Sequence, residues 1–177
     1  MMSKTGRLMK RIKIIAEIGI NHDGTVETAR KLIQESANSG VSSVKFQYRN
    51  LHNAYSDTAR EIGDELLLTE IRKNYLSPSI LLDLSAYAHE LGLEAGISFF
   101  DTVDMEDFGE KIDTFDFFKL PSAELTNAEL ITAMLKSGKQ VFLSTGCHNE
   151  SELEAAFSPL PAEGWMPMHC ISNYPVS

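Results

Sequence analysis

Short apolar runs alternate along the chain with longer amphipathic stretches. The apolar runs are rich in β-branched and aromatic residues, as in buried strands, and the amphipathic stretches have the apolar spacing of helices. The predicted strands cover Ile12 to Ile18, Val41 to Tyr48, Leu93 to Phe99, Thr114 to Leu120, Gln140 to Ser144 and Gly164 to Cys170. Six units of this kind, counting an unpaired last strand, predict an α/β protein with a parallel sheet and helices outside it.

Residues that favour helix ends bound several of the amphipathic stretches. Ser77 and Pro78 form an N-cap followed by a proline at the first helical position, and Thr126 with Glu129 has the spacing of a capping box. Asn149 with Glu152 offers a weaker cap, and Gly40, Gly92 and Gly138 stand where helices end. The predicted helices cover Val26 to Ser39, Glu61 to Asn74, Pro78 to Leu91, Val103 to Lys111, Thr126 to Gly138 and Asn149 to Phe157.

Two architectures fit this pattern, an open doubly wound sheet and part of a (β/α)8 TIM barrel. An open sheet gathers its ligand site at one switch point, whereas in a barrel the carboxyl ends of all strands face one shared site. Polar residues follow almost every predicted strand, which favours the barrel: Glu17, Asn21 and His22; Lys45 and Gln47; Ser98; Lys119, Ser122 and Glu124; Ser144 and Thr145; His169, Ser172 and Tyr174. A whole barrel takes about 250 residues, so we expect an incomplete barrel of about six of its eight units.

Composition and charge narrow the classes of function. The chain has 177 residues, enough for one core and too few for two typical domains, with 16 Lys+Arg against 25 Asp+Glu and a formal charge of −9. No basic stripe is present, which argues against nucleic acid or an anionic membrane as partner, and no apolar run approaches the length of a transmembrane helix.

Residues 1–11 form a polar tail without the apolar core of a secretory signal, so the predicted domain is 12–177. Cys147 and Cys170 fit no disulfide framework, and we expect a cytoplasmic protein.

Two lysines at strand ends are the main candidates for chemistry. Alternation places Lys45 and Gln47 on one face of their strand. A lysine inside a barrel mouth needs an anionic partner because an unpaired buried charge is costly. That partner is either a bound anion or a core carboxylate such as Glu17, and the pattern leaves both open. Lys119, at the end of a neighbouring strand, would complete a pocket for phosphate or carboxylate.

Other motifs carry weaker signals. The run Ser144-Thr145-Gly146 before a helix is a conceivable oxyanion cradle, but taken alone it is better explained as a turn. Adjacent strand residues point to opposite faces, so His169 and Cys170 cannot easily bind one metal ion together. The remaining histidines lack ligand spacing, and Cys147 has no accompanying motif of a thiol hydrolase.

Five motifs in order resemble those of the N-acetylneuraminate (sialic acid) synthases, a family that also holds pseudaminic acid, legionaminic acid and spore-coat polysaccharide synthases. The motifs are Ile15 to Gly24, Val44 to Gln47, Phe118 to Glu124, Leu143 to Gly146, and His169-Cys170 through Tyr174-Pro175. The resemblance runs from about Ile12 to Pro175, nearly the whole chain.

This resemblance implies a carbon–carbon bond-forming transferase. It would condense phosphoenolpyruvate with an N-acylated amino sugar of the N-acetylmannosamine type to a nine-carbon 2-keto sugar acid of the sialic acid type plus phosphate. The resemblance implies that phosphoenolpyruvate is held by Lys45, Ser98, Lys119, Ser122 and Ser144. Gln47 and Tyr174 would contact the sugar. Glu17 and Glu124 would share proton transfer and water activation, with the division of roles left open.

Departures from the family pattern are also visible. Ser98 stands in place of a usual threonine, and the proline that follows it in the family is replaced by Phe99. The resemblance implies a divalent metal, Mn or Mg, whose two histidine ligands would lie beyond Ser177, as would a C-terminal antifreeze-like domain that completes the partner's site in a homodimer. We therefore expect a homodimer or a complementing chain, and no stable, active monomer from these residues alone. The alternatives are a non-catalytic phosphoenolpyruvate-binding or regulatory paralogue and an inactive fragment of the synthase; the coding sequence downstream would distinguish them.

Overall fold

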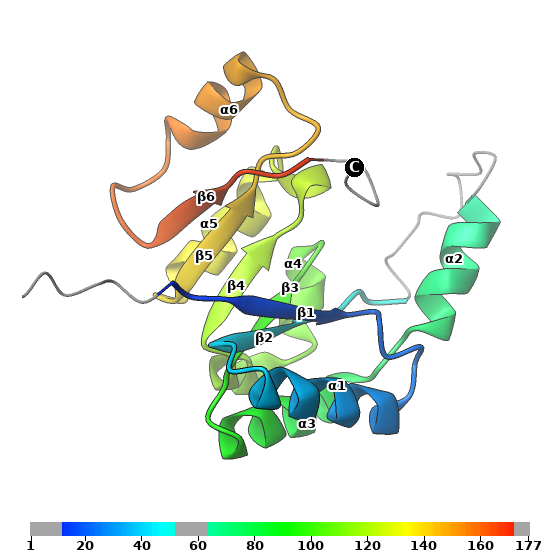
Figure 1. Cartoon of the computed structure of the whole chain (residues 1–177). Coiled ribbons are helices and arrows are strands. Elements are labelled where there is room, and N and C mark those ends of the chain that lie inside the picture. The colour runs from blue at the N-terminus through cyan, green and yellow to red at the C-terminus, as the bar shows by residue number, and fades with distance from the viewer. Residues whose placement is uncertain (1–11, 52–63, 172–177) are drawn as a thin grey trace, which may run out of the picture.

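Parallel strands in sequential order form the centre of the fold (Figure 1). The computed structural model describes residues 12–51 and 64–171. The strands are β1 (Ile15–Gly19), β2 (Ser43–Gln47), β3 (Glu94–Ser98), β4 (Phe117–Leu120), β5 (Gln140–Ser144) and β6 (Trp165–Met168). Every neighbouring pair is parallel and no strand is skipped, which is the order of a barrel and not that of a doubly wound sheet. Within the described residues the sheet is open, with β1 and β6 at its edges.

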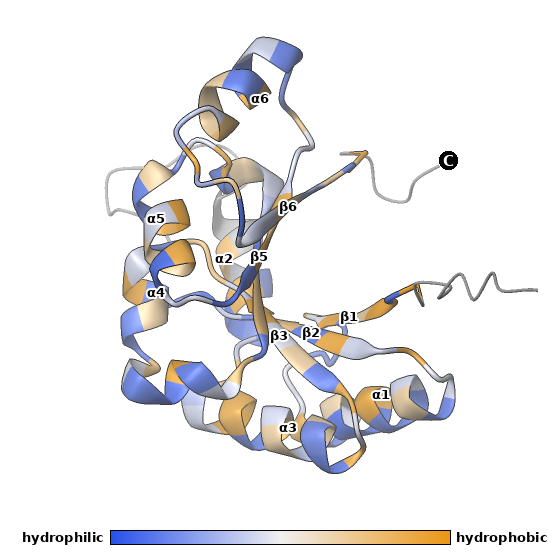
Figure 2. Cartoon of the chain, turned by 90° about the vertical axis from the view of Figure 1, so that its left-hand side faces the viewer, coloured by the Kyte–Doolittle hydropathy of each residue, from blue (hydrophilic) through white to orange (hydrophobic). Residues whose placement is uncertain are grey.

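Helices cover one side of this sheet. They are α1 (Val26–Asn38), α2 (Asp64–Lys73), α3 (Pro78–Glu90), α4 (Thr102–Glu106), α5 (Ala128–Lys136) and α6 (Glu150–Phe157), with 3₁₀ helices at Gly109–Thr114 and Ser122–Glu124. Figure 2 shows the sheet curving, with α1, α3, α4 and α5 along its convex side. The concave side therefore faces away from these helices, as the inside of a barrel does.

Strict alternation along the strands gives the sheet two different faces. The face toward the helices is the hydrophobic core, and its strand residues are fully buried: Val44, Phe46, Ala95, Ile97, Phe118, Leu120, Val141 and Leu143. Ile33 of α1, Leu81 of α3 and Leu130 of α5 belong to the same cluster. The intervening strand residues, among them Lys45 and Ser98, lie on the opposite, inner face. The alternation seen in the sequence therefore separates a packed outer layer from a polar inner one.

Several predicted boundaries are confirmed and others are wrong. Ser77 caps α3, and Asn149 forms a capping box with Glu152 on α6. The cap of α5 is Asn127 and not Thr126, because the Asn127 side chain accepts the N–H of Leu130 at 3.1 Å.

The helix predicted over Val103 to Lys111 is two shorter elements. Its first part, α4, begins at a capping box between Asp101 and Asp104, and a 3₁₀ helix follows from Gly109, whose φ is +52°. This second turn occupies the residues before Phe117, so β4 begins three residues later than the predicted strand at Thr114.

The helix predicted over Glu61 to Asn74 appears as α2 from Asp64, and residues 61–63 lie outside the described part. The first and last predicted strands shorten to β1 and β6. Trp165 at the start of β6 packs on Phe157 of α6, with ring centroids 4.8 Å apart, and its Nε1 donates to the carbonyl of Pro161 at 2.7 Å. These contacts attach α6 to the edge strand.

The inner face depends on one glycine for its packing. Gly96 of β3 lies in register with Lys45 on one side and Phe117 on the other. A Cβ atom at Gly96 would lie 2.1 Å from the ring of Phe117, which is itself 1% exposed and packs edge-on against Phe142 at 5.3 Å. Gly96 therefore provides the space that the Phe117 ring occupies.

The loop between β1 and α1 encloses a buried histidine. His22 is 1% exposed, and its Nδ1 accepts the N–H of Gly24 at 3.0 Å. Gly24 has a φ of +73°, and a Cβ there would lie 2.0 Å from the carbonyl oxygen of Lys73, so the loop contacts the end of α2 closely. Burial lowers the pKa of His22, although a backbone hydrogen bond at Gly19 and the charge of Asp23 oppose this effect. The neutral imidazole is therefore part of the folded loop.

We predict that Gly96→Ala lowers the free energy of unfolding by about 1–3 kcal/mol, because the added methyl group overpacks against Phe117. Urea denaturation followed by far-UV circular dichroism measures the change. Phe117→Leu in the same chain should recover part of the loss, so a double-mutant cycle should show coupling. Strictly additive effects would contradict this account of Gly96.

We also predict that the protein loses stability as the pH falls below about 6.5, since the unfolded chain then binds a proton that folded His22 excludes. The loss continues down to the lowered folded-state pKa, with a slope of at most about 1.4 kcal/mol per pH unit from this group. The control variant His22→Asn retains an acceptor for the Gly24 N–H and does not titrate. Urea denaturation at several pH values should show a smaller acid dependence for His22→Asn; identical curves would rule out His22 as the source.

Candidate active site

Polar side chains converge at the carboxyl ends of the strands on the inner face. Lys45 lies in register with Glu17 of β1, and Gln47, Ser98 and Lys119 form the next level across β2, β3 and β4. Register partners in a parallel sheet point to the same side. The structure thus brings together residues that are far apart in the sequence and that were predicted as one site.

Lys45 is the most constrained residue of this group. It is 3% exposed, its Nζ lies 2.8 Å from Oε2 of Glu17, and it donates to Oγ of Ser98 at 2.9 Å. The core carboxylate considered from the sequence is therefore present as its partner. Burial lowers the pKa of Lys45, Glu17 opposes that change, and the positive charge of Lys119 lowers it further. The two lysines are close enough to sense each other's charge.

Glu17 and Lys119 complete the charge pattern around Lys45. The Glu17 side chain is 50% exposed, so the ion pair has one buried and one open end. Lys119 is half-buried and forms no ion pair among residues 12–51 and 64–171. An ammonium group has three donors, and the two contacts of Lys45 use two of them. Within residues 12–51 and 64–171, a third donor on Lys45 and the charge of Lys119 are therefore not matched by an ion pair.

Ser144 of β5 has an unusual environment. It is 1% exposed, and its Oγ has no hydrogen-bond partner among the described residues. A buried hydroxyl without a partner carries a desolvation cost. A ligand oxygen on the inner face would relieve that cost.

Ser122 lies at the end of β4 and contacts the loop after β5. Its Oγ accepts the N–H of Gly146 at 3.1 Å, and Oγ1 of Thr145 donates to the carbonyl of Met168 at 2.9 Å. The Ser-Thr-Gly run is thus a turn held by neighbouring elements, with the Gly146 N–H already engaged by Ser122.

Glu124, Tyr174 and Gln47 complete the set of predicted site residues. Oε2 of half-buried Glu124 accepts from Nδ2 of Asn127 at 3.2 Å, beside the start of α5. No hydrogen bond or ion pair joins Glu124 to Glu17 or Lys45 among the described residues. Tyr174 lies outside the described residues, and Gln47 borders a hollow at the end of β2.

The described residues offer no cluster of three or more His, Cys, Asp or Glu side chains that would hold a metal ion. Searching the same residues finds no helix long and apolar enough to cross a membrane.

Sequence reasoning missed a polar network beside the end of β2. Asp104 of α4 is 1% exposed, and its carboxylate accepts the backbone N–H groups of Asn50, Phe100 and Asp101 at 2.7, 2.8 and 3.1 Å. Asp107 accepts from Tyr48 Oη and Asn50 Nδ2, both at 2.6 Å. The sequence gives no local signal for the contacts of Tyr48 and Asn50, because they join segments more than fifty residues apart. The capping box between Asp101 and Asp104, in contrast, is local.

Comparisons with known proteins identify relatives of the chain. The chain is 36% identical to the N,N′-diacetyllegionaminic acid synthase of Campylobacter jejuni over 94% of its own length and 53% of the relative's. It is 31% identical to the N-acetylneuraminate-9-phosphate synthase of Drosophila melanogaster, covering 97% of the chain and 48% of the relative. The chain thus spans about half the length of the relatives it matches.

Solved structures show the same fold. The sialic acid synthetase of Leptospira borgpetersenii, determined in complex with citrate, superposes with a TM-score of 0.80 at 25% identity, over 92% of this chain and 55% of that one. A spore coat polysaccharide biosynthesis protein E from Chromobacterium violaceum gives a TM-score of 0.81 at 24% identity, covering 92% and 50% of the two chains. The profile of the NeuB family matches residues 32–177. With its fold, its inner-face lysines and its relatives, the chain belongs to the NeuB family of sialic and related nonulosonic acid synthases.

Proposed function

We propose that the protein containing this chain condenses phosphoenolpyruvate with an N-acylated amino sugar to a nine-carbon 2-keto sugar acid and phosphate. The observation that carries the proposal is the buried Lys45, bound to Glu17 and Ser98 and electrostatically coupled to Lys119. Family membership supports the reaction class.

Phosphoenolpyruvate matches the charge pattern of the inner face. It carries a phosphate and a carboxylate, and two lysines on neighbouring levels of the sheet would neutralise them with charge-assisted hydrogen bonds. Ser98, Ser122 and Ser144 would supply hydroxyl groups around the same anion, and the unpaired Oγ of Ser144 would gain a partner. Glu17 would keep Lys45 charged when the pocket is empty, since its charge opposes the effect of burial on the lysine's pKa.

Glu17 and Glu124 are the proposed proton-transfer groups. Bond formation between the methylene carbon of phosphoenolpyruvate and the sugar aldehyde requires a proton on the aldehyde oxygen. Water that adds to the phosphate-bearing carbon must lose a proton before phosphate leaves. Two carboxyl groups can divide these tasks. Gln47 and Tyr174 would contact the sugar, with Gln47 directly above Lys45 on the same strand face.

We predict that phosphoenolpyruvate raises the melting temperature of the complete protein that contains this chain, and that Lys45→Met or Lys119→Met weakens its binding. The loss of a charge-assisted contact should cost roughly 10- to 100-fold in affinity. Differential scanning fluorimetry and isothermal titration calorimetry measure the two effects. Lys136→Met, on the exposed last turn of α5, is the control and should bind as the wild type does.

Unchanged affinity in both lysine variants would defeat the assignment of the pocket. Inorganic phosphate and pyruvate serve as separate ligands, since each carries one of the two anionic groups. Each should bind more weakly than phosphoenolpyruvate if the two lysines recognise both groups together.

A second prediction concerns Glu124. In the catalytically complete protein, Glu124→Gln should bind phosphoenolpyruvate normally and release phosphate roughly 10²–10⁴-fold more slowly, because glutamine cannot transfer a proton. The glutamine carbonyl still accepts from Asn127, so the start of α5 should be unaffected. Turnover equal to that of the wild type would reduce Glu124 to a structural contact of Asn127.

A further inference from the structure

The two cysteines of the chain follow neighbouring strands at the same end of the sheet. Cys147 belongs to the loop that connects β5 to α6, and Cys170 follows the last residue of β6 by two positions. Both thiols are free; Cys147 is exposed and Cys170 is half-buried. Neither residue has a role in the proposed binding of phosphoenolpyruvate, so their common location asks for a separate explanation.

The main chain of β5 and β6 brings the two cysteines toward each other. Ser144 is in register with Met168, and the N–H of Thr145 still donates to the carbonyl of Met168 at 3.2 Å. The two segments therefore stay side by side past the end of β5. Cys147 comes two residues after Thr145, and Cys170 comes two residues after Met168.

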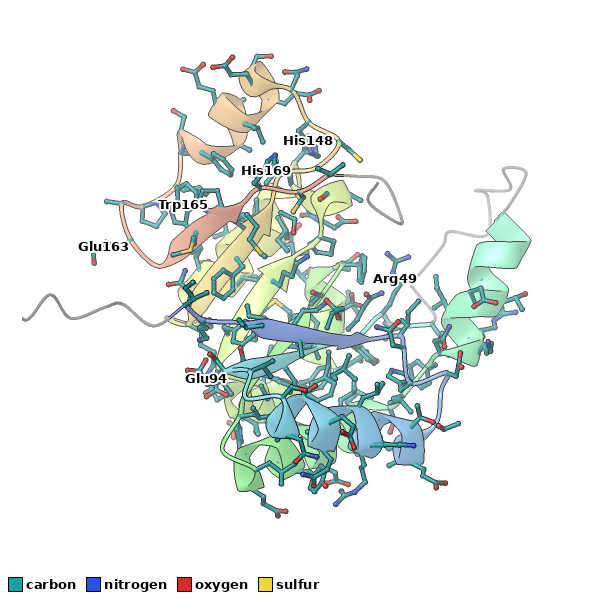
Figure 3. The ribbon with its side chains drawn as sticks, in the orientation of Figure 1. Arg49, Glu94, His148, Glu163, Trp165 and His169 are labelled. Atoms are coloured by element: carbon teal, nitrogen blue, oxygen red, sulfur yellow. The ribbon has the colours of Figure 1, made fainter. Side chains whose placement is uncertain are left out.

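The figures show the same neighbourhood from different directions. In both Figure 1 and Figure 2 the loop after β5 passes beside the carboxyl end of β6 on its way to α6. Figure 3 places His148 and His169, the chain neighbours of the two cysteines, at this same end of the sheet.

The carbonyl of Met168 links the Cys170 thiol to the start of the loop. This carbonyl accepts from Sγ of Cys170 at 3.3 Å and from Oγ1 of Thr145 at 2.9 Å. The Cys170 sulfur thus lies within two hydrogen-bond lengths of the Thr145 side chain. A disulfide needs its Cα atoms about 4.4–6.8 Å apart, and consecutive Cα atoms are about 3.8 Å apart. The segment from Thr145 to Cys147 is therefore short enough to place Cys147 in that range by a movement of the loop alone.

The conformation of the loop favours such a movement. Cys147 has a φ of +65°, in the left-handed region that residues other than glycine rarely adopt. The loop is held by Gly146, whose N–H donates to Oγ of Ser122 at 3.1 Å and whose carbonyl accepts from Nδ1 of His148 at 2.7 Å. A shift of Cys147 out of the left-handed region would release backbone strain.

We propose that Cys147 and Cys170 are a thiol pair that glutathione disulfide converts reversibly to an intramolecular disulfide. The exposed Cys147 thiolate attacks one sulfur of glutathione disulfide and releases one glutathione thiolate. The Cys170 thiolate then attacks Sγ of Cys147 in the mixed disulfide, which forms the new S–S bond and releases the second glutathione thiolate. The two protons of the protein thiols pass through solvent to the two released thiolates. The two cysteines are thereby oxidised, and one glutathione disulfide is reduced to two glutathione molecules.

The disulfide acts on the inner face through Ser122. β4 and β6 lie on opposite sides of β5, so drawing Cys147 toward Cys170 draws Gly146 away from Ser122. Ser122 and Ser144 are two of the hydroxyl groups proposed to surround phosphoenolpyruvate. The disulfide itself is independent of the proposed function, whereas this effect on phosphoenolpyruvate rests on it.

The test is to equilibrate the complete protein that contains this chain with glutathione buffers, from reduced to oxidised, and to map its disulfides by alkylation and mass spectrometry. No Lys or Arg lies between the two cysteines, so trypsin leaves both in one peptide. Glutamyl endopeptidase cleaves after glutamates such as Glu150 and Glu163 and separates them. We expect a linked pair of peptides in the oxidised buffer, lighter by two hydrogens than the two free peptides together, and its loss on addition of dithiothreitol.

A matched control moves the exposed thiol to another place on the same unit. Cys147→Ser combined with Ser158→Cys keeps an exposed cysteine but places it after the far end of α6. This variant should form no link to Cys170. Wild-type protein that carries only a glutathione adduct on Cys147, or that shows no more linkage to Cys170 than the control does, overturns the thiol pair.

Calorimetric titration with phosphoenolpyruvate separates the thiol pair from its effect. Oxidation should weaken binding by about 2- to 10-fold, as expected for the loss of one hydrogen bond. Cys147→Ser should bind as the reduced wild type does in both buffers. A mapped disulfide with unchanged affinity overturns the effect through Ser122 and supports the thiol pair. Absence of binding to the reduced wild type overturns the proposed function, and the peptide map still decides whether the disulfide forms.

Discussion

The ion pair between Lys45 and Glu17, with its hydrogen bond to Ser98, is the contact on which the inner face depends. It joins β1, β2 and β3 through side chains, on the side of the sheet that the helices do not cover. A charged lysine at 3% exposure is tolerated only with such partners. The arrangement therefore stabilises the sheet and also keeps a positive charge where the proposed substrate would place its anionic groups.

The outer face supplies the rigidity that this inner arrangement needs. Phe46, Ile97 and Phe118 are fully buried under α1, α3 and the other outer helices, which fixes the strand residues next to them in the chain. Successive residues of a strand point to opposite faces of the sheet. Each residue buried on the outer face therefore also determines where the next side chain points on the inner face. The packed core thus opposes small shifts of Lys45 relative to Ser98. Side chains of a site built on strands are held in more precise positions than those of a site built on loops.

Patterns of residues close together in the sequence are sufficient to predict much of the fold and part of the site. Alternation at Lys45 and Gln47 assigned both to one face correctly, and the caps at Ser77 and Asn149 were identified because the responsible side chains are close in sequence. Thr126 and Asn127 are adjacent polar residues that both fit a cap, and only the hydrogen bond from the Leu130 N–H identifies Asn127 as the capping residue. The hydrogen bond from the Asn50 N–H to Asp104 was out of reach since it joins segments distant along the chain, and Tyr174 stays a prediction.

The single tryptophan of the chain has a consequence for spectroscopy. Trp165 begins the edge strand β6, is partly exposed, and is held by Phe157 of α6 and by the carbonyl of Pro161. Its fluorescence therefore reports on the docking of the last strand–helix unit against the hydrophobic core, whose other residues contribute no tryptophan signal. Edge units open locally at lower free energy than the centre of a sheet. Comparing emission with circular dichroism would therefore resolve fraying of this unit from global unfolding of the sheet.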